Sequence, residues 1–185
     1  MDPVISALIP HAEGKVQAKI AEVLGNFSDA ILRRVAEAKT IVRPLKKGER
    51  YAEASLALRR LGIDVDAWPA PPAGLFVVEE RTVYLRSCSP MTVAHEFGHA
   101  IDCALGGGVY VSVTDPKIRS AFLKARRFVT PYAASGIDEY FAEAVRAYGE
   151  VNDASSHWPK ATRTRLKGVD PTMYGIVESL IGCAT

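Results

Sequence analysis

The chain has 185 residues, of which 48% are hydrophobic and 24% are charged, a composition typical of a globular protein with one sizeable core. The net charge of +2 is too small to favour binding to nucleic acid or to an anionic membrane. No apolar run approaches the roughly 20 residues that span a bilayer. Met1–Val4 do not begin a secretory signal, so we expect a cytoplasmic protein or export by a non-classical route. The cysteines lack CxxC spacing and are expected to be buried or free thiols: Cys88, Cys103 and Cys183.

Residues 1–60 are expected to form a helical region that packs on a domain formed by residues 61–185, or extends it. Apolar side chains recur there at helical spacing, and Asn26–Asp29 supply residues that typically cap a helix. Pro44 should stop a short β-branched run, and Gly62 should end a helix. The expected elements are helices over 16–24, 31–38 and 49–61 and a strand over 40–43.

Residues 74–86 are expected to form a hairpin, with two strands flanking a polar turn at 79–81. Ser89 and Pro90 then supply the N-cap and first residue of a helix that the glycines at 106–108 should end near Leu105. Its apolar stripe fixes one face in the core: Val93, Phe97, Ala100, Ile101 and Ala104.

The segment after this helix, 106–113, is glycine-rich and is expected to form a flexible flap. Helices are expected from Asp115 to about Phe128, from a capping-box-like start at Ser135, and over 171–181. The sequence therefore predicts an α+β fold that is mostly helical, with a small β-hairpin before the helix of residues 90–105.

That helix carries the sequence His95-Glu96-Phe97-Gly98-His99. Histidines four residues apart lie on one face of a helix, so both can bind a single Zn²⁺. Glu96 projects about 100° around the helix, beside the open coordination position. There it can take a proton from a zinc-activated water, as in the HExxH pattern of metallopeptidases. The alternative is a pair of surface histidines on an amphipathic helix.

A catalytic zinc site usually has three protein ligands and a water, so one ligand remains to be found. The candidates are Asp102, Asp138, Glu139, Glu143 and His157. Asp102 lies one turn beyond His99. A short carboxylate there is better placed to hydrogen-bond a residue that surrounds the metal ligands than to reach the metal itself. His157 lies in a polar loop that no helix constrains.

Glu139 and Glu143 lie one turn apart on the polar face of their helix. One of them could bind zinc while the other accepts the free N–H of a ligand histidine. The alternative is a solvated acidic stripe in which Arg146 pairs with Glu143. Spacing alone leaves both interpretations open.

Three blocks of the sequence resemble the catalytic domain of anthrax lethal factor and the related secreted Pro-Pro endopeptidases. They are GLFVVEERTVYL at 74–85, HEFGHAID at 95–102 and EYFAEA at 139–144. The resemblance continues through Arg165–Lys167 and the last helix, so it covers roughly residues 60–183. It implies a zincin-like metallopeptidase fold of the gluzincin type, a zinc ion and a protein or peptide substrate.

In that family the glutamate that opens the EYFAEA-like block is the third zinc ligand, which implies Glu139 here. A tyrosine seven residues earlier lies over the zinc, which implies Tyr132 as an oxyanion donor. The alternative for Tyr132 is a loop aromatic packed on the core. Glu143 is implied as a hydrogen-bond partner of a ligand histidine. The segment between Gly106 and Tyr132 matches only loosely, so substrate preference does not carry over.

The function expected from the sequence is a zinc-dependent endopeptidase with Glu96 as the general base. Thr82–Leu85 is expected to be either an exposed edge strand that pairs with an extended substrate or a strand covered on both sides. Two alternatives remain: a zinc hydrolase of a non-peptide amide, and a non-catalytic protein in which zinc clamps two helices through four protein ligands.

Overall fold

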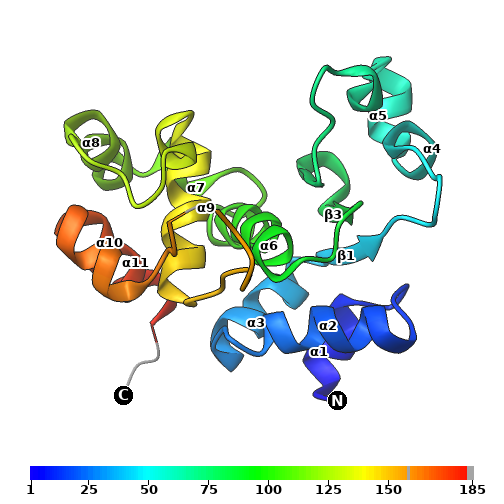
Figure 1. The fold of residues 1–185 in the computed structure, drawn as a ribbon, viewed down its shortest axis with the longest axis horizontal. Coiled ribbons are helices and arrows are strands. Elements are labelled where there is room, and N and C mark those ends of the chain that lie inside the picture. Colours follow the sequence, from blue (N-terminus) through cyan, green and yellow to red (C-terminus); the bar gives the residue numbers. More distant parts are fainter. Residues whose placement is uncertain (158, 183–185) are drawn as a thin grey trace.

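The computed structural model describes residues 1–157 and 159–182. Helix α6 (Pro90–Leu105) runs through the middle of the molecule (Figure 1). A small sheet packs on one side of α6, and helix α9 (Ile137–Tyr148) packs on the other. The two histidines of the motif therefore lie on the helix around which the rest of the fold is assembled.

The sheet has three strands, β1 (Ile41–Pro44), β2 (Gly74–Val77) and β3 (Thr82–Leu85), in the order β1-β3-β2. β1 runs parallel to β3, with Val42 opposite Val83, and β2 runs antiparallel to β3. The first proposal for Thr82–Leu85, an exposed edge strand, is wrong: β3 is the central strand and all four of its residues are buried. The sheet edge beside α6 belongs to β2.

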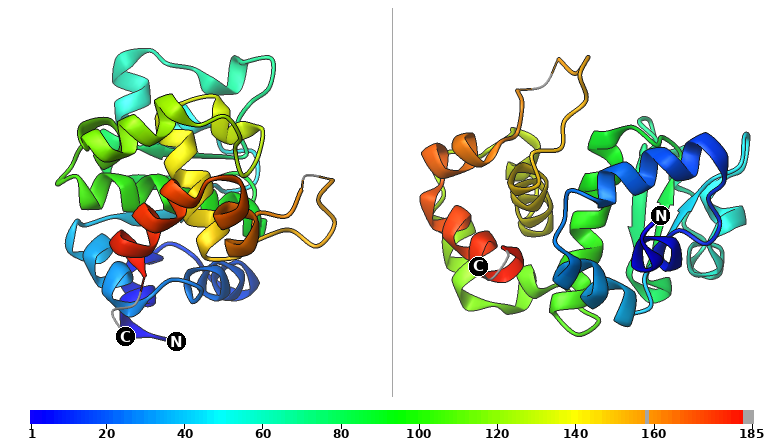
Figure 2. Two further views of the ribbon diagram at one scale, coloured as in Figure 1. Left: turned by 90° about the vertical axis from the view of Figure 1, so that its left-hand side faces the viewer. Right: turned by 90° about the horizontal axis from the view of Figure 1, so that it is seen from below.

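The N-terminal helices are α1 (Pro3–Leu8), α2 (Gly14–Leu24) and α3 (Asp29–Glu37), and they form a layer below the sheet and α6 (Figures 1 and 2). α2 and α3 pack against α6, while α1 contacts β1. Ser28 caps α3 by accepting a hydrogen bond from the backbone N–H of Ile31. Since β1 from the first 60 residues pairs with β3, elements from both sides of residue 60 form one sheet.

The helix expected over 49–61 is two short helices, α4 (Tyr51–Ala54) and α5 (Leu56–Leu61). Ser55 separates them in an extended conformation, and its hydroxyl caps α5 at Leu58. Gly62 ends α5 in the left-handed conformation, as predicted. Two short 3-10 helices, η1 (Val65–Ala67) and η2 (Val78–Glu80), complete this part of the fold.

The C-terminal part is helical, with α7 (Val111–Thr114), α8 (Pro116–Lys124), η3 (Tyr132–Ala134), α10 (Arg163–Val169) and α11 (Pro171–Ile181) around α9. The flap expected at 106–113 is instead a tight turn followed by α7. α8 ends at Lys124, earlier than predicted. The expected cap of α9 is wrong, because the Ser135 hydroxyl donates to the backbone oxygen of Tyr132 and Gly136 occupies the N-cap position.

The close approach of α6 and α9 depends on a glycine. A Cβ added to Gly98 would lie 3.0 Å from the Cα and backbone oxygen of Ala142. The apolar stripe predicted for α6 is buried, with Val93, Phe97 and Ile101 fully inaccessible. Gly98 and this stripe together bring the first turn of α9 against the histidine face of α6.

The α+β class, mostly helical with a small sheet before the histidine helix, is confirmed. Within the described residues, no helix is long and apolar enough to cross a membrane. Cys88 and Cys103 are free thiols, half-buried and buried respectively. Cys183 lies outside the described residues.

Candidate metal centre

His95 and His99 project from one face of α6, which Ser89 and Pro90 start as predicted. Their Nε2 atoms are 3.2 Å apart, and the two rings meet edge to face. His99 is 6% exposed. The arrangement is the one that helical spacing predicts, and it directs two imidazole nitrogens at one point.

Glu139 reaches the same point from the first turn of α9. Its Oε2 atom is 3.0 Å from Nε2 of His95 and 3.4 Å from Nε2 of His99. Ligand atoms that bind zinc tetrahedrally at about 2.0–2.1 Å are themselves about 3.3 Å apart. The three separations therefore match three corners of a zinc-sized tetrahedron.

The electrostatics of these atoms also favour a cation. Oε2 of Glu139 is buried and accepts no hydrogen bond of acceptable geometry from the described residues. Burial opposes ionisation of Glu139, but the close approach of the His95 and His99 imidazoles lowers its pKa to about 2. Burial likewise lowers the pKa of His95, yet the carboxylates of Glu139 and Glu143 raise it to about 10. Two imidazoles and an ionised carboxylate are a donor set that suits Zn²⁺, so the residues present fit the ion.

Glu143, one turn further along α9, holds the other side of His95. Its Oε1 is 2.9 Å from Nδ1 of His95, and Arg146 donates hydrogen bonds to both of its oxygens. The alternative of a solvated acidic stripe is wrong, because Glu143 is only 4% exposed, although it does pair with Arg146 as that alternative expected. The carboxylate accepts from Nδ1–H, so Nε2, the atom that faces Glu139, is the nitrogen that can bind a metal ion when the ion displaces its proton.

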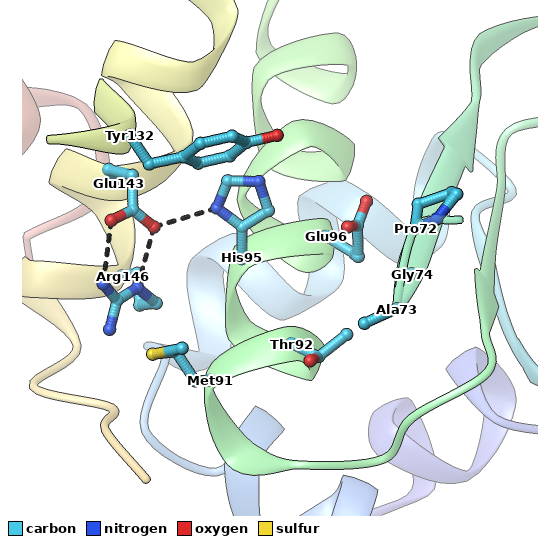
Figure 3. A pocket seen from close by; sticks show the side chains of 10 residues that line it. All are labelled: Pro72, Ala73, Gly74, Met91, Thr92, His95, Glu96, Tyr132, Glu143 and Arg146. Atoms are coloured by element: carbon cyan, nitrogen blue, oxygen red, sulfur yellow. Dashed lines mark hydrogen bonds and ion pairs between the residues drawn. The ribbon is translucent and has the colours of Figure 1, made fainter. Parts of the chain in front are cut away.

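Glu96 lies beside His95 (Figure 3), and its carboxylate is not one of the three converging donors. It is 9% exposed, and burial raises its pKa, while the charges of His95 and His99 act in the opposite direction. The backbone of Phe76 in β2 also hydrogen-bonds to its carboxylate. A carboxylate with a raised pKa is a better proton acceptor near neutral pH than an ordinary surface glutamate.

The backbone pairing of β2 explains how Phe76 reaches Glu96. Ala73 accepts hydrogen bonds from Arg86 and Ser87, on the β3 side. Because antiparallel partners alternate, Gly74 and Phe76 direct their backbone N–H and C=O groups away from β3, towards α6. Phe76 uses this edge for Glu96, and Gly74 lies close to the same side chain.

Gly74 leaves the space that Glu96 occupies. A Cβ at position 74 would lie 2.5 Å from Cγ of Glu96 and 2.9 Å from Cγ2 of Thr92. We expect Gly74→Ala to displace Glu96 and to slow any reaction that uses Glu96 as the base about 100-fold, because a shift of about 1 Å at a reacting group can have that effect. Zinc content, measured by elemental analysis, should stay at the wild-type level.

Gly175→Ala on α11 is the matched control, because a Cβ there meets no atom within 4 Å. Equal activity of the Gly74→Ala variant and the wild-type protein would show that Glu96 tolerates a methyl group at this position.

Tyr132 lies over His95, with the two ring centroids 5.4 Å apart (Figure 3). Its hydroxyl donates to Oε1 of Glu139 at 3.1 Å. The side chain is 48% exposed, so it borders the site and is not part of the core. Burial of the ring and the nearby charge of Glu139 raise the pKa of Tyr132, which keeps the phenol protonated and able to donate.

The other candidates lie elsewhere. Asp102 is fully buried and accepts hydrogen bonds from the backbone N–H and hydroxyl of Ser112, at 2.8 and 2.6 Å, so it anchors α7 to α6. Burial raises the pKa of Asp102 to about 6. His157 is exposed in its loop. Within the described part of the chain, His95, His99 and Glu139 are the group whose ligand atoms converge, and neither Asp138 nor His157 belongs to it.

Tyr110 is a neighbour of the site that sequence reasoning missed. Its ring lies 5.8 Å from that of His99 and 6.4 Å from that of Phe76. The turn after α6 returns the chain to this position, and a Cβ on Gly106 would lie 2.0 Å from the backbone oxygen of Val109. The glycines at 106–108 indicate that the chain reverses here. The local sequence does not show that the reversal brings Tyr110 next to His99.

A pocket of about 280 Å³ opens beside His95 and Glu96 (Figure 3). Its walls come from α6, from α9 and η3, and from the segment leading into β2. They are Pro72, Ala73, Gly74, Met91, Thr92, His95, Glu96, Tyr132, Glu143 and Arg146. The charges of Glu143 and Arg146 neutralise each other, so the far wall of this pocket carries no unpaired charge.

A small sheet, a helix with the HExxH sequence beside its edge strand, and a second helix that brings a glutamate to the histidines form a zincin-like α+β fold. No protein-family model and no curated protein matches the sequence. A solved structure, the Pro-Pro endopeptidase PPEP-2 from Paenibacillus alvei, matches with a TM-score of 0.68 and 20% sequence identity. The match covers 96% of this chain and 100% of that chain, so the likeness in fold includes most of the first 60 residues.

Proposed function

We propose that the protein is a zinc-dependent endopeptidase that hydrolyses peptide bonds of a protein substrate. The observation that carries this proposal is the convergence of Nε2 of His95, Nε2 of His99 and Oε2 of Glu139 at separations of 3.0–3.4 Å, with Glu96 beside them. The endopeptidase with the same fold supports peptides as the substrate class.

The chemistry that zinc supplies at such a site is Lewis-acid activation of a water molecule and of the scissile carbonyl. In the proposed mechanism Glu96 accepts the proton of the attacking water and transfers it to the leaving amine. Tyr132 donates its phenolic hydrogen to the oxygen that becomes negatively charged. Glu143 holds His95 in the tautomer whose Nε2 is free to bind.

The free edge of β2 is the best place for an extended substrate. The outward backbone groups of Gly74 can pair with a peptide backbone beside Glu96. The adjoining pocket, with Met91 and Thr92 in its wall, would take an uncharged side chain next to the cleaved bond. This assigns to β2 the role that the sequence suggested for Thr82–Leu85.

The proposal is tested by incubating the purified protein with a complex peptide library and identifying the new termini by mass spectrometry. We expect cleavage that stops when a chelator removes the metal and returns when zinc is added back. A parallel panel of small non-peptide amides tests the alternative hydrolase. Cleavage of those amides without peptide cleavage would replace the proposed substrate class. The absence of chelator-sensitive cleavage of either kind would favour the zinc clamp.

Tyr132→Phe tests the oxyanion donor. We expect kcat to fall about 100-fold with little change in KM, because removal of one oxyanion donor typically costs about 10²–10³ in rate. Tyr174→Phe is the matched control, since its hydroxyl also bonds to a glutamate, Glu178, but on the exposed face of α11. Steady-state kinetics on one library-derived peptide suffice, and an unchanged kcat would remove Tyr132 from the mechanism.

The clamp alternative requires a fourth protein ligand in place of water. Among the described residues, three donors converge, and both Cys88 and His157 lie outside their group. The arrangement therefore favours the catalytic interpretation.

A further inference from the structure

We infer that Arg146 is a positioning residue of the metal centre. It connects Glu143, the hydrogen-bond partner of His95, to the base of the loop between α9 and α10. This inference rests on the metal centre of the proposed function and extends it beyond the residues that touch the metal or the substrate. The loop base is defined here as Val151, Asn152 and Ala161. The consequence is that a change at the loop base alters how tightly the centre holds zinc.

Arg146 is a buried charge whose donors point at one carboxylate. It is 2% exposed, and its Nε and Nη2 donate to Oε1 and Oε2 of Glu143 at 2.9 and 2.8 Å. The same carboxylate contacts Nδ1 of His95 at 2.9 Å and accepts from the hydroxyl of Thr130 at 2.5 Å. Two donors on each oxygen leave Glu143 little freedom to rotate, so the ring of His95 is fixed as well.

The third nitrogen of Arg146 faces the loop base. Nη1 donates to the backbone oxygen of Val151 at 3.0 Å and to Oδ1 of Asn152 at 3.2 Å. Asn152 in turn closes the loop, donating to the backbone oxygen of Ala161 and accepting from its N–H, both at 2.8 Å. One guanidinium therefore joins the two ends of the loop to the carboxylate that holds His95.

The same loop also touches the start of α6. Asp153 accepts a hydrogen bond from the backbone N–H of Met91 at 2.8 Å, in the first turn of the helix that carries both histidines. Residues 154–157 extend away from the body of the molecule (Figure 2). Both helices that supply the converging donors are thus connected to one surface loop, α9 through Arg146 and α6 through the contact of Met91 with Asp153 of the loop.

The chemistry of this position suits arginine in particular. A planar guanidinium can serve a carboxylate with two parallel N–H groups and still present a third nitrogen in another direction. A lysine has one ammonium and cannot meet Glu143 bidentately while also reaching Val151 and Asn152. A buried ion pair is weak evidence for added stability, so the pairing of all three guanidinium nitrogens of Arg146 points to a role in geometry.

The test measures zinc affinity by chelator competition and the absorption spectrum of the Co²⁺-substituted protein, which reports ligand geometry. Arg146→Gln should weaken zinc binding about tenfold or more, as loss of outer partners of metal ligands typically does. The decisive measurement is a double-mutant cycle with Glu143→Gln. If Arg146 acts through Glu143, its replacement should have little further effect on zinc affinity in the Glu143→Gln background. Additive losses would overturn the inference.

Arg43→Gln is the matched control, because Arg43 also pairs with a glutamate, Glu49, but at the sheet. It should lower thermal stability without changing zinc affinity or the cobalt spectrum. Arg146→Lys and Asn152→Ala are milder variants for the case in which Arg146→Gln does not fold. Both should alter the cobalt spectrum, and a wild-type spectrum in both would contradict the inference. Wild-type protein that takes up no zinc would instead refute the proposed function itself.

Discussion

Glu96→Ala should abolish peptide hydrolysis while the protein keeps its zinc. Glu96 lies beside the three converging donors but contributes none of their atoms, so its removal leaves the proposed ligand set intact. General acid–base catalysis contributes about 10²–10⁴ to the rate, and kcat is expected to fall by that factor. The measurement is kcat on one library-derived peptide, with zinc content determined on the same sample.

Glu79→Ala serves as the control for this experiment, because Glu79 is an exposed glutamate on η2 that can lose its carboxylate without touching the site. Wild-type activity in the Glu96→Ala variant would assign the proton transfer to another group. Loss of zinc from that variant would mean that Glu96 takes part in holding the metal.

The helix that carries the histidines was predicted correctly from end to end because its signals are local. Ser89 and Pro90 define its start, and Gly106 follows its last residue. The convergence of His95 and His99 then follows from helical spacing alone, without any knowledge of the tertiary fold. The helix cap predicted at Ser135 was wrong because the hydroxyl of Ser135 donates its hydrogen bond to the backbone oxygen of Tyr132 instead.

The assignment of the third donor depended on tertiary structure. Helical spacing places Glu139 and Glu143 on one face of α9, but which of them reaches the histidines depends on where α9 crosses α6. That crossing is set by the contact between Gly98 and Ala142, which are far apart in sequence. The resemblance to a known family pointed to Glu139 where the physics of spacing could not.

The position of Thr82–Leu85 in the sheet, at an edge or covered on both sides, could not be decided from the sequence for a similar reason. The hairpin of β2 and β3 follows from alternating apolar residues around a polar turn, and it was expected correctly. The parallel pairing of β1 with β3 joins residues about 40 positions apart, and no local pattern announces it. That pairing makes β3 central and leaves β2 as the strand beside Glu96.

Glu139→Ala should reduce zinc binding more than any other single carboxylate substitution. It removes the oxygen that lies 3.0 Å and 3.4 Å from the two histidine nitrogens, leaving two protein donors of three. Loss of an outer hydrogen-bond partner costs about 10–100-fold in metal affinity, so Glu143→Ala should fall in that range and Glu139→Ala should exceed it. Chelator competition on the two variants gives the order directly.

Thermal unfolding provides a second readout. Zinc that binds only the folded protein stabilises it by about 4 kcal/mol at a free concentration 1,000 times its Kd, and this increment should be largely absent in Glu139→Ala. Asp138→Ala is the control, since Asp138 is the preceding acid on the same first turn and lies outside the converging group. It should retain both the zinc and the stabilisation. Stoichiometric zinc in Glu139→Ala, with zinc lost from Glu143→Ala, would transfer the ligand role to Glu143.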